Sequence, residues 1–148
     1  PDSALYLTDG PGNIIYRIDI PKLHEVTTFA FGDALSGPHG ICWFPVRQVF
    51  LVTASNTNQV IALDVSGKKQ SIPSVILKTP EVIRADESGN IYIAAPSLSS
   101  VYKLLPSFAM VSFRLGLDAP TGLAFQKDGN QILITSFSGG TVQSVSVQ

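Results

Sequence analysis

The chain has 148 residues, of which 45% are hydrophobic and only 14% are charged, and its formal net charge is -1. This length suffices for one domain that buries about 70% of the surface of its unfolded chain, and the balanced charge argues against a nucleic-acid-binding face. Its one cysteine, Cys42, excludes an internal disulfide. No apolar run reaches the roughly 20 residues that a membrane-spanning helix needs, so we expect no membrane partner.

The chain consists of short segments rich in β-branched and aromatic residues, separated by Gly, Pro, Asn and Ser. Prolines interrupt every window long enough for a helix, and no segment sustains a helical period, so each segment predicts a strand. In chain order the predicted strands are 5–9, 14–19, 26–31, 38–41, 49–53, 60–64, 74–77, 80–83, 91–95, 101–105, 110–115, 120–123, 132–136 and 142–146.

The predicted strands repeat along the chain. Three units open with a proline, at Pro38, Pro80 and Pro120, which are 42 and 40 residues apart. Two further columns of residues share spacings of 45, 41 and 41 residues. These columns are Thr8, Thr53, Ala94 and Thr135, and Ile18, Leu63, Leu104 and Val145. A repeat of this length, with four short strands, is typical of a β-propeller blade.

The repeat predicts an all-β fold, a single β-propeller or half-propeller domain over residues 1–148 built of four-stranded antiparallel blades. The approximate blades are 1–37, 38–79, 80–119 and 120–148. The first unit lacks its opening strand and the last lacks its outermost one, so the strand count is 3, 4, 4 and 3. An open arc would expose an apolar blade face at each end. We therefore expect half of a larger ring; the alternative is a self-contained ring of four blades.

One segment carries a family resemblance. Residues 120–135 have the pattern Pro-x-Gly-Leu-Ala-Phe-x-x-Asp-Gly-Asn-x-Ile-Leu-Ile-Thr, which resembles a blade of the NHL-repeat and gluconolactonase-like (senescence-marker-type) propellers. Residues 80–95 resemble it nearly as well, and residues 38–55 less so. The resemblance implies the propeller frame, within which unrelated activities occur. The Trp-Asp and Gly-His signatures of WD-repeat propellers are absent.

The residues that follow the three opening prolines are His39, Glu81 and Thr121. In the gluconolactonase-like family, the corresponding positions hold a divalent metal, such as calcium, on the propeller axis. The resemblance therefore implies His39 and Glu81 as metal-ligand candidates and all three residues as ligand-binding candidates. The family's Pro-Asn-Gly and Pro-Asp-Gly forms do not occur here. The competing interpretation is that these polar side chains simply line a wet channel.

His39 also lies in Gly37-Pro38-His39-Gly40, which resembles the inner-strand histidines of propeller lyases that cleave streptogramins. An imidazole at this position could act as a general base, which makes His39 the candidate catalytic residue. No second histidine stands at a matching position, and a structural histidine is the alternative. His24 is expected on the outer surface.

Small polar residues fill the loops that should share one mouth with the inner strands. Asn56 and Asn58 could bind a sugar or peptide, although such residues also supply turn conformations. Asp9 is a lone acid at a repeat position occupied elsewhere by Ala54, Ala95 and Ser136; it could assist a site or cap its own glycine-rich loop. Cys42 is expected to be a small buried hydrophobe.

Two functions from different classes follow. The first is a binding or interaction module, completed by a second copy or a second propeller chain, with a small molecule, sugar or peptide at the axial mouth. The second is a metal-dependent lactonase or ester hydrolase, or a histidine-based lyase, with its site on the axis. The chain begins at Pro1 without a methionine, so we expect either a processed terminus, with a lean to the extracellular space, or a piece of a longer protein.

Overall fold

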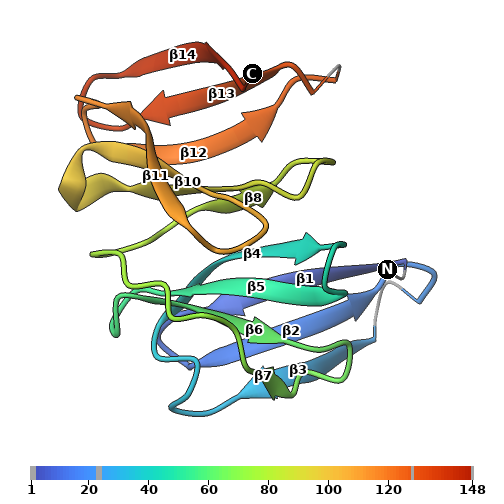
Figure 1. The fold of residues 1–148 in the computed structure, drawn as a ribbon. Helices are drawn as coiled ribbons and strands as arrows, with labels where there is room; N and C mark the ends of the chain where they lie inside the picture. Colours follow the sequence, from blue (N-terminus) through green and yellow to red (C-terminus); the bar gives the residue numbers. More distant parts are fainter. Residues whose placement is uncertain (1–2, 23–24, 128, 148) are drawn as a thin grey trace.

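The computed structural model describes residues 3–22, 25–127 and 129–147, which form fourteen strands in four antiparallel sheets (Figure 1). We number these sheets as blades I to IV in chain order. Blade I contains β1 (Ala4–Asp9), β2 (Ile14–Asp19) and β3 (Val26–Phe31). Blade II contains β4 (Pro38–Phe44), β5 (Val49–Ala54), β6 (Gln59–Leu63) and β7 (Lys69–Gln70).

Blade III contains β8 (Ile83–Ala85), β9 (Ile91–Ala95), β10 (Ser100–Leu104) and β11 (Met110–Leu115), with the short helix η1 (Pro96–Leu98) between β9 and β10. Blade IV contains β12 (Pro120–Phe125), β13 (Gln131–Ser136) and β14 (Thr141–Ser146). Each strand pairs with the next one in its blade, so every blade is a simple up-and-down sheet. Among the described residues, no helix has the length and apolar character that crossing a membrane requires.

The blades pack face to face in chain order, and their first strands lie next to one another (Figure 1). The repeat spacing makes β1 the equivalent of β5, β9 and β13, the second strands of the other blades. The predicted count of 3, 4, 4 and 3 strands is confirmed. Among the described residues β1 pairs only with β2, so blade I lacks an opening strand.

Blade II shows why the repeat folds this way. All six residues of β5 are buried, because the strand has a blade on each side. Phe50 and Val52 belong to the apolar cluster shared with blade I, whereas Val49 and Leu51 belong to the cluster shared with blade III. The period-2 alternation of a strand thus sends successive apolar side chains into two separate cores. Each large side chain buried in this way contributes about 1.5–3 kcal/mol.

Left-handed residues close the loops between second and third strands at a constant repeat position. Asn13, Asn58, Ser99 and Gly140 have φ values of 51°, 56°, 49° and 58°, and they follow the 45, 41 and 41 spacing of the repeat. The carbonyls of the first three accept hydrogen bonds from the N–H groups of Gly32, Leu77 and Leu117, respectively. Asn and Gly tolerate this conformation best, which explains why the loops are rich in them.

The outermost strand of blade II differs from the prediction. A strand was expected at 74–77, but the structure has the two-residue β7 and an isolated bridge between Gln59 and Ile76. Pro73 separates the two pieces, and a proline has no N–H to donate to a ladder. The segment nevertheless follows β6, because the Val75 carbonyl accepts from the Val60 N–H at 3.2 Å.

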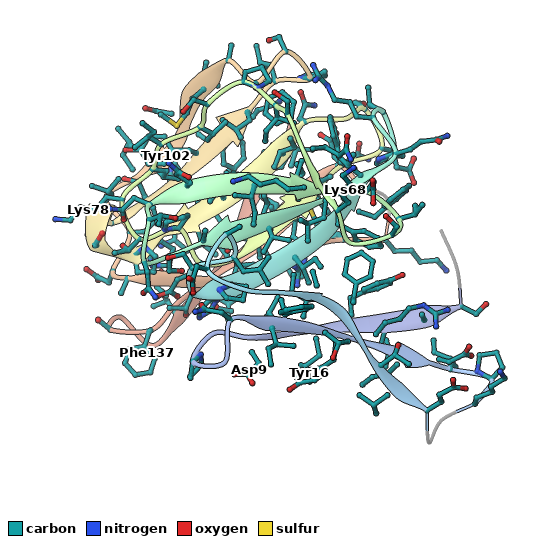
Figure 2. All side chains as sticks on the ribbon, turned by 90° about the horizontal axis from the view of Figure 1, so that it is seen from below. Asp9, Tyr16, Lys68, Lys78, Tyr102 and Phe137 are labelled. Carbon is teal, nitrogen blue, oxygen red and sulfur yellow. The ribbon has the colours of Figure 1, made fainter. Side chains whose placement is uncertain are left out.

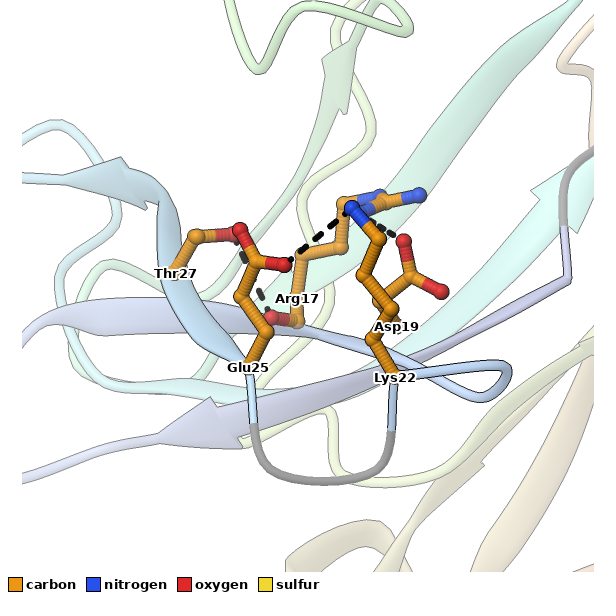
Figure 3. Close-up of polar contacts among 5 residues, drawn as sticks. All are labelled: Arg17, Asp19, Lys22, Glu25 and Thr27. Carbon is orange, nitrogen blue, oxygen red and sulfur yellow. Dashed lines mark hydrogen bonds and ion pairs between the residues drawn. The ribbon is translucent and has the colours of Figure 1, made fainter.

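The ion pairs of blade I lie at the β2–β3 hairpin, at the opposite ends of these strands from the Gly10–Asn13 loop (Figure 3). Arg17 and Asp19 approach to 3.6 Å, and Lys22 and Glu25 to 3.5 Å. The Thr27 hydroxyl donates to the Arg17 carbonyl at 3.3 Å. The Lys22–Glu25 pair is exposed and the Arg17–Asp19 pair is partly exposed. Such pairs contribute at most about 1 kcal/mol, so they add little to the stability of the fold.

Candidate functional site

The entries to the first strands and the loops between second and third strands meet at one end of the blades, as the sequence predicted. The Ser55 N–H donates to the Gly37 carbonyl at 3.0 Å, and the Asn56 N–H donates to the Ser36 carbonyl at 3.2 Å. In blade IV, the Phe137 N–H donates to the Ala119 carbonyl at 2.9 Å. We call this end the mouth.

His39, Glu81 and Thr121 all lie at the mouth, each directly after a buried proline. Pro38 and Pro120 begin β4 and β12, as predicted, but the strand predicted at 80–83 begins only at Ile83, because Pro80 has no N–H to donate to a ladder. The His39 side chain is exposed, and Glu81 and Thr121 are partly buried. The backbones of β4 and β8 are close here, since a Cβ built on Gly40 would be 2.9 Å from the Ile83 nitrogen. The three candidates thus hold equivalent positions of the repeat, His39 in β4, Thr121 in β12 and Glu81 two residues before β8.

The backbone at this column is fixed by threonines from the preceding blade. The Thr8 hydroxyl donates to the His39 carbonyl at 2.6 Å, and the Thr53 hydroxyl donates to the Glu81 carbonyl at 2.5 Å. Thr53 also accepts the Gly40 N–H at 2.7 Å. Thr8 and Thr53, two members of the column that revealed the repeat, therefore form hydrogen bonds between blades.

A metal centre needs several ligands, and the described residues contain no group of three or more His, Cys, Asp or Glu side chains that could hold an ion. No hydrogen bond or ion pair between the His39 and Glu81 side chains is found in the described part of the chain. These two residues could each supply one ligand, a neutral imidazole nitrogen and a carboxylate oxygen. Further ligands would have to come from backbone carbonyls, water or another chain.

Other polar candidates hold the loops of the mouth in shape. Asp9 accepts the Gly12 N–H at 3.1 Å, so it caps its own loop. Asn58 accepts the Thr79 N–H at 2.8 Å, and Asn13 accepts the Gly37 N–H at 2.8 Å in the same way. These side chains support the left-handed residues that precede the opening prolines. Asn56 is exposed beside Gly37.

Cys42 is only partly buried by area and packs against the cluster between blades II and III. Burial raises the pKa of its thiol to about 12, although the positive charge of Arg84 acts in the opposite direction. The thiol therefore stays protonated at neutral pH, which does not suit a nucleophile. His24 and Asp128 lie outside the described residues.

The aromatic residues divide into packed and exposed ones. Phe50 lies at the centre of a cluster, with ring centroids 4.3 Å from Tyr6, 5.0 Å from Trp43 and 5.2 Å from Phe29. Phe137 is different, because it lies on the mouth loop of blade IV and is 82% exposed (Figure 2). Packing between blades therefore does not explain Phe137, which is available to a ligand at the mouth.

A hollow that the sequence did not predict lies at the opposite end from the mouth. It has a volume of about 510 Å³ and lies between the hairpins of blades III and IV, with Asp86 and Asn90 on one side and Phe125 on the other. Asp86 is already engaged, because it accepts hydrogen bonds from Asn90 and, at 3.4 Å, from the Tyr92 hydroxyl. Burial first, and then the charge of Asp86, raise the pKa of Tyr92.

Solved structures of known proteins share this arrangement of blades. A gluconolactonase from Xanthomonas campestris aligns with a TM-score of 0.83 at 17% identity, over 98% of this chain and 55% of that one. Virginiamycin B lyase from Staphylococcus aureus, solved with quinupristin, aligns with a TM-score of 0.76 at 19% identity, over 98% and 48%. The fold is that of a β-propeller.

A chain of the nidogen/laminin complex also aligns, with a TM-score of 0.79 at 17% identity over 97% of this chain and 57% of that one. The propeller neighbours thus include a hydrolase, a lyase and a protein of a binding complex, and their low identity establishes the fold alone. This propeller chain spans about half the length of the structures it matches. No protein-family model and no curated protein matches the chain.

Proposed function

We propose that the chain is a propeller interaction module whose ring is completed by a second copy or by another propeller chain, with a ligand bound at the mouth. The observation that carries this proposal is the apolar outer face of blade I. Leu5, Leu7 and Val26 are 56%, 55% and 57% exposed. The side chains at the positions equivalent to Leu5 and Leu7 in blades II and III are buried, because a preceding blade covers them; they are Phe50, Val52, Ile91 and Ile93.

The outer face of blade I carries Leu5, Leu7, Tyr16, Ile18 and Val26, as the strand pairing places them on one side. Figure 2 shows Tyr16 and Asp9 pointing away from the other sheets. The outer face of blade IV is smaller and more polar; it carries Leu133, Thr135 and the 66% exposed Val142. Exposed apolar side chains gathered on one face favour a protein partner over solvent.

Association through the blade I face can be tested with Leu7→Lys. We expect the parent chain to sediment as a dimer or larger species. Leu7→Lys should shift it to a monomer, because association would bury the lysine ammonium group in the interface without a partner for its charge. Val65→Lys is the matched control, since Val65 is 63% exposed in the loop after β6. Sedimentation velocity measures both. A parent chain that remains a single copy at all concentrations would remove the support for association between copies.

A metal-dependent hydrolase is the second candidate, favoured by the equivalent positions of His39 and Glu81 at the mouth. In that case the purified protein should bind calcium or zinc, and the His39→Ala/Glu81→Ala double variant should lose the ion. Elemental analysis and calorimetric titration measure the stoichiometry, with Glu87→Ala as the control because Glu87 is exposed in a hairpin at the other end. A chain that binds neither ion would exclude this candidate.

A further inference from the structure

The outer strand of blade II is interrupted at the rim of the molecule. β7 (Lys69–Gln70) pairs with β6 over only two residues, and the chain next bridges to β6 at Ile76, opposite Gln59. Residues 71–75 between these contacts belong to no strand, and a hollow of about 230 Å³ lies between this segment and β6. The outer strands of blades I and III, β3 and β11, are instead continuous over six residues. Blade II therefore carries an irregular segment where its neighbours have a regular edge.

Ser71 is the first residue of this segment, and it is exposed. Ile72 follows and is partly buried, because it packs against the cluster between blades II and III. Pro73 then fixes its own φ and has no N–H to donate. Among the described residues, no hydrogen bond of the Ser71 hydroxyl is found. The segment is thus attached to the core directly beside Ser71, whereas the hydroxyl itself is open to solvent.

Two lysines precede Ser71, at three and two positions before it. Lys68 and Lys69 are both exposed, and neither forms an ion pair within the described part of the chain. Figure 2 shows Lys68 well away from Phe137 of the mouth. Ser71 is the only serine or threonine of the sequence with two basic residues among the three that precede it. The same stretch therefore combines an accessible hydroxyl with the positive charge of two lysines.

A turn centred on Asp64 holds the backbone in front of Ser71. The Asp64 carboxylate accepts the Lys68 N–H at 3.1 Å and an N–H of the Gln70 side-chain amide at 2.7 Å. It also accepts the Ser66 hydroxyl at 2.6 Å, so this nearby serine is already engaged. These bonds orient the main chain and leave both lysine side chains in solvent. Because β7 has only two paired residues, the stretch with the lysines and Ser71 can detach from the sheet edge at a low cost.

We propose that Ser71 is a phosphorylation site for a serine kinase that recognises basic residues. A substrate groove lined by carboxylates attracts Lys68 and Lys69, and these charge pairs place the Ser71 hydroxyl at the bound ATP. The Ser71 Oγ attacks the γ-phosphorus, the bond from this phosphorus to the bridging oxygen of ADP breaks, and the hydroxyl proton passes to a carboxylate of the kinase. The product carries a charge of about −1.5 to −2 at Ser71. The rim of blade II thereby changes from basic to acidic, which alters the partners it can bind.

Phosphorylation of the purified chain tests the proposal. The probes are ATP and the catalytic subunit of cAMP-dependent protein kinase, which acts on serines preceded by two basic residues. We expect a single phosphate per folded chain, located at Ser71 by mass spectrometry of its peptides, and no phosphate on Ser71→Ala. Lys68→Gln/Lys69→Gln should slow the transfer by about tenfold or more, because the attraction to the groove is lost. Ser74→Ala is the matched control and should react like the parent, since Ser74 is exposed in the same segment without a basic residue among the three before it.

The urea midpoint should be the same for all these variants, so that a loss of transfer reports the site and not a loss of folding. A chain that takes up no phosphate, or takes it up at Ser66 or Ser74, would overturn the proposal. So would an equal rate for the lysine variant and the parent. Phosphorylation of Ser71 only after heat unfolding would do the same, because the folded rim would then not reach the kinase. Phosphate transfer depends neither on association between copies nor on a ligand at the mouth, so the proposed function and this site can fail separately.

Discussion

Gly40→Ala should reduce the free energy of unfolding by about 3 kcal/mol or more, at the upper end of what overpacking costs. The added methyl group would meet backbone atoms of the next blade, with the Glu81 carbonyl oxygen nearest and the Ile83 nitrogen 2.9 Å away. Backbone held in a sheet cannot rotate aside as a side chain can, so β4 and β8 would have to separate. Urea unfolding followed by the fluorescence of Trp43 measures the change.

Gly122→Ala is the matched control, because Gly122 holds the same repeat position in blade IV. A Cβ there would meet only the side chain of Thr135, whose Oγ1 is nearest and whose Cβ is 3.4 Å away. Thr135 is exposed and can change rotamer, and alanine reduces the entropy of the unfolded chain. We expect a stability within about 1 kcal/mol of the parent. Equal losses at both glycines would contradict close packing of β4 against β8.

Thr53→Val should lower the free energy of unfolding by about 2–3 kcal/mol. The substitution keeps the shape of a fully buried side chain but removes the hydroxyl that joins the Gly40 N–H to the Glu81 carbonyl. Both backbone groups are partly buried and would lose this partner, and an unsatisfied buried group costs about 1–3 kcal/mol. The loss is best measured as the shift in urea midpoint at constant slope.

Thr135→Val provides the comparison for Thr53→Val, because the two residues share one column of the repeat. Thr135 is exposed on the outer face of blade IV, against which no further sheet of the described residues packs. Its replacement should change the stability by less than about 0.5 kcal/mol, as is usual for surface positions. If Thr135→Val were as damaging as Thr53→Val, the threonine column would act within blades rather than between them.

Much of the fold could be predicted from the sequence because its signals are local. Strands at 14–19, 26–31, 91–95 and 110–115 have the predicted bounds, since β-branched runs ending at Gly, Pro or Asn leave few alternatives. The outer strand of blade II was less predictable. Pro73 has no N–H to donate to the neighbouring strand. Whether the residues before or after this proline form the outer strand depends on β6, with which they pair.

The candidate site was predicted only in outline. The opening prolines placed His39, Glu81 and Thr121 at one mouth, because equivalent positions of stacked blades must coincide. The roles of Asn58 and Asp9 as supports of loop backbone could not be separated from ligand binding, because both roles select the same small polar side chains. The exposure of Phe137 could not be predicted either, since an aromatic residue at the end of a strand gives no sign of which neighbour will cover it.

The sequence by itself determined the repeat, the number of blades and most of the strands within them, because propensity, turn chemistry and alternation all act within about 40 residues. Only the tertiary structure decided that threonines bond from blade to blade, that glycine is required where β4 crosses β8, and that a hollow lies between the hairpins of blades III and IV. These features arise where one blade meets the next. They depend on the twist of each sheet and on the distance between neighbouring sheets, which the sequence of one repeat does not determine.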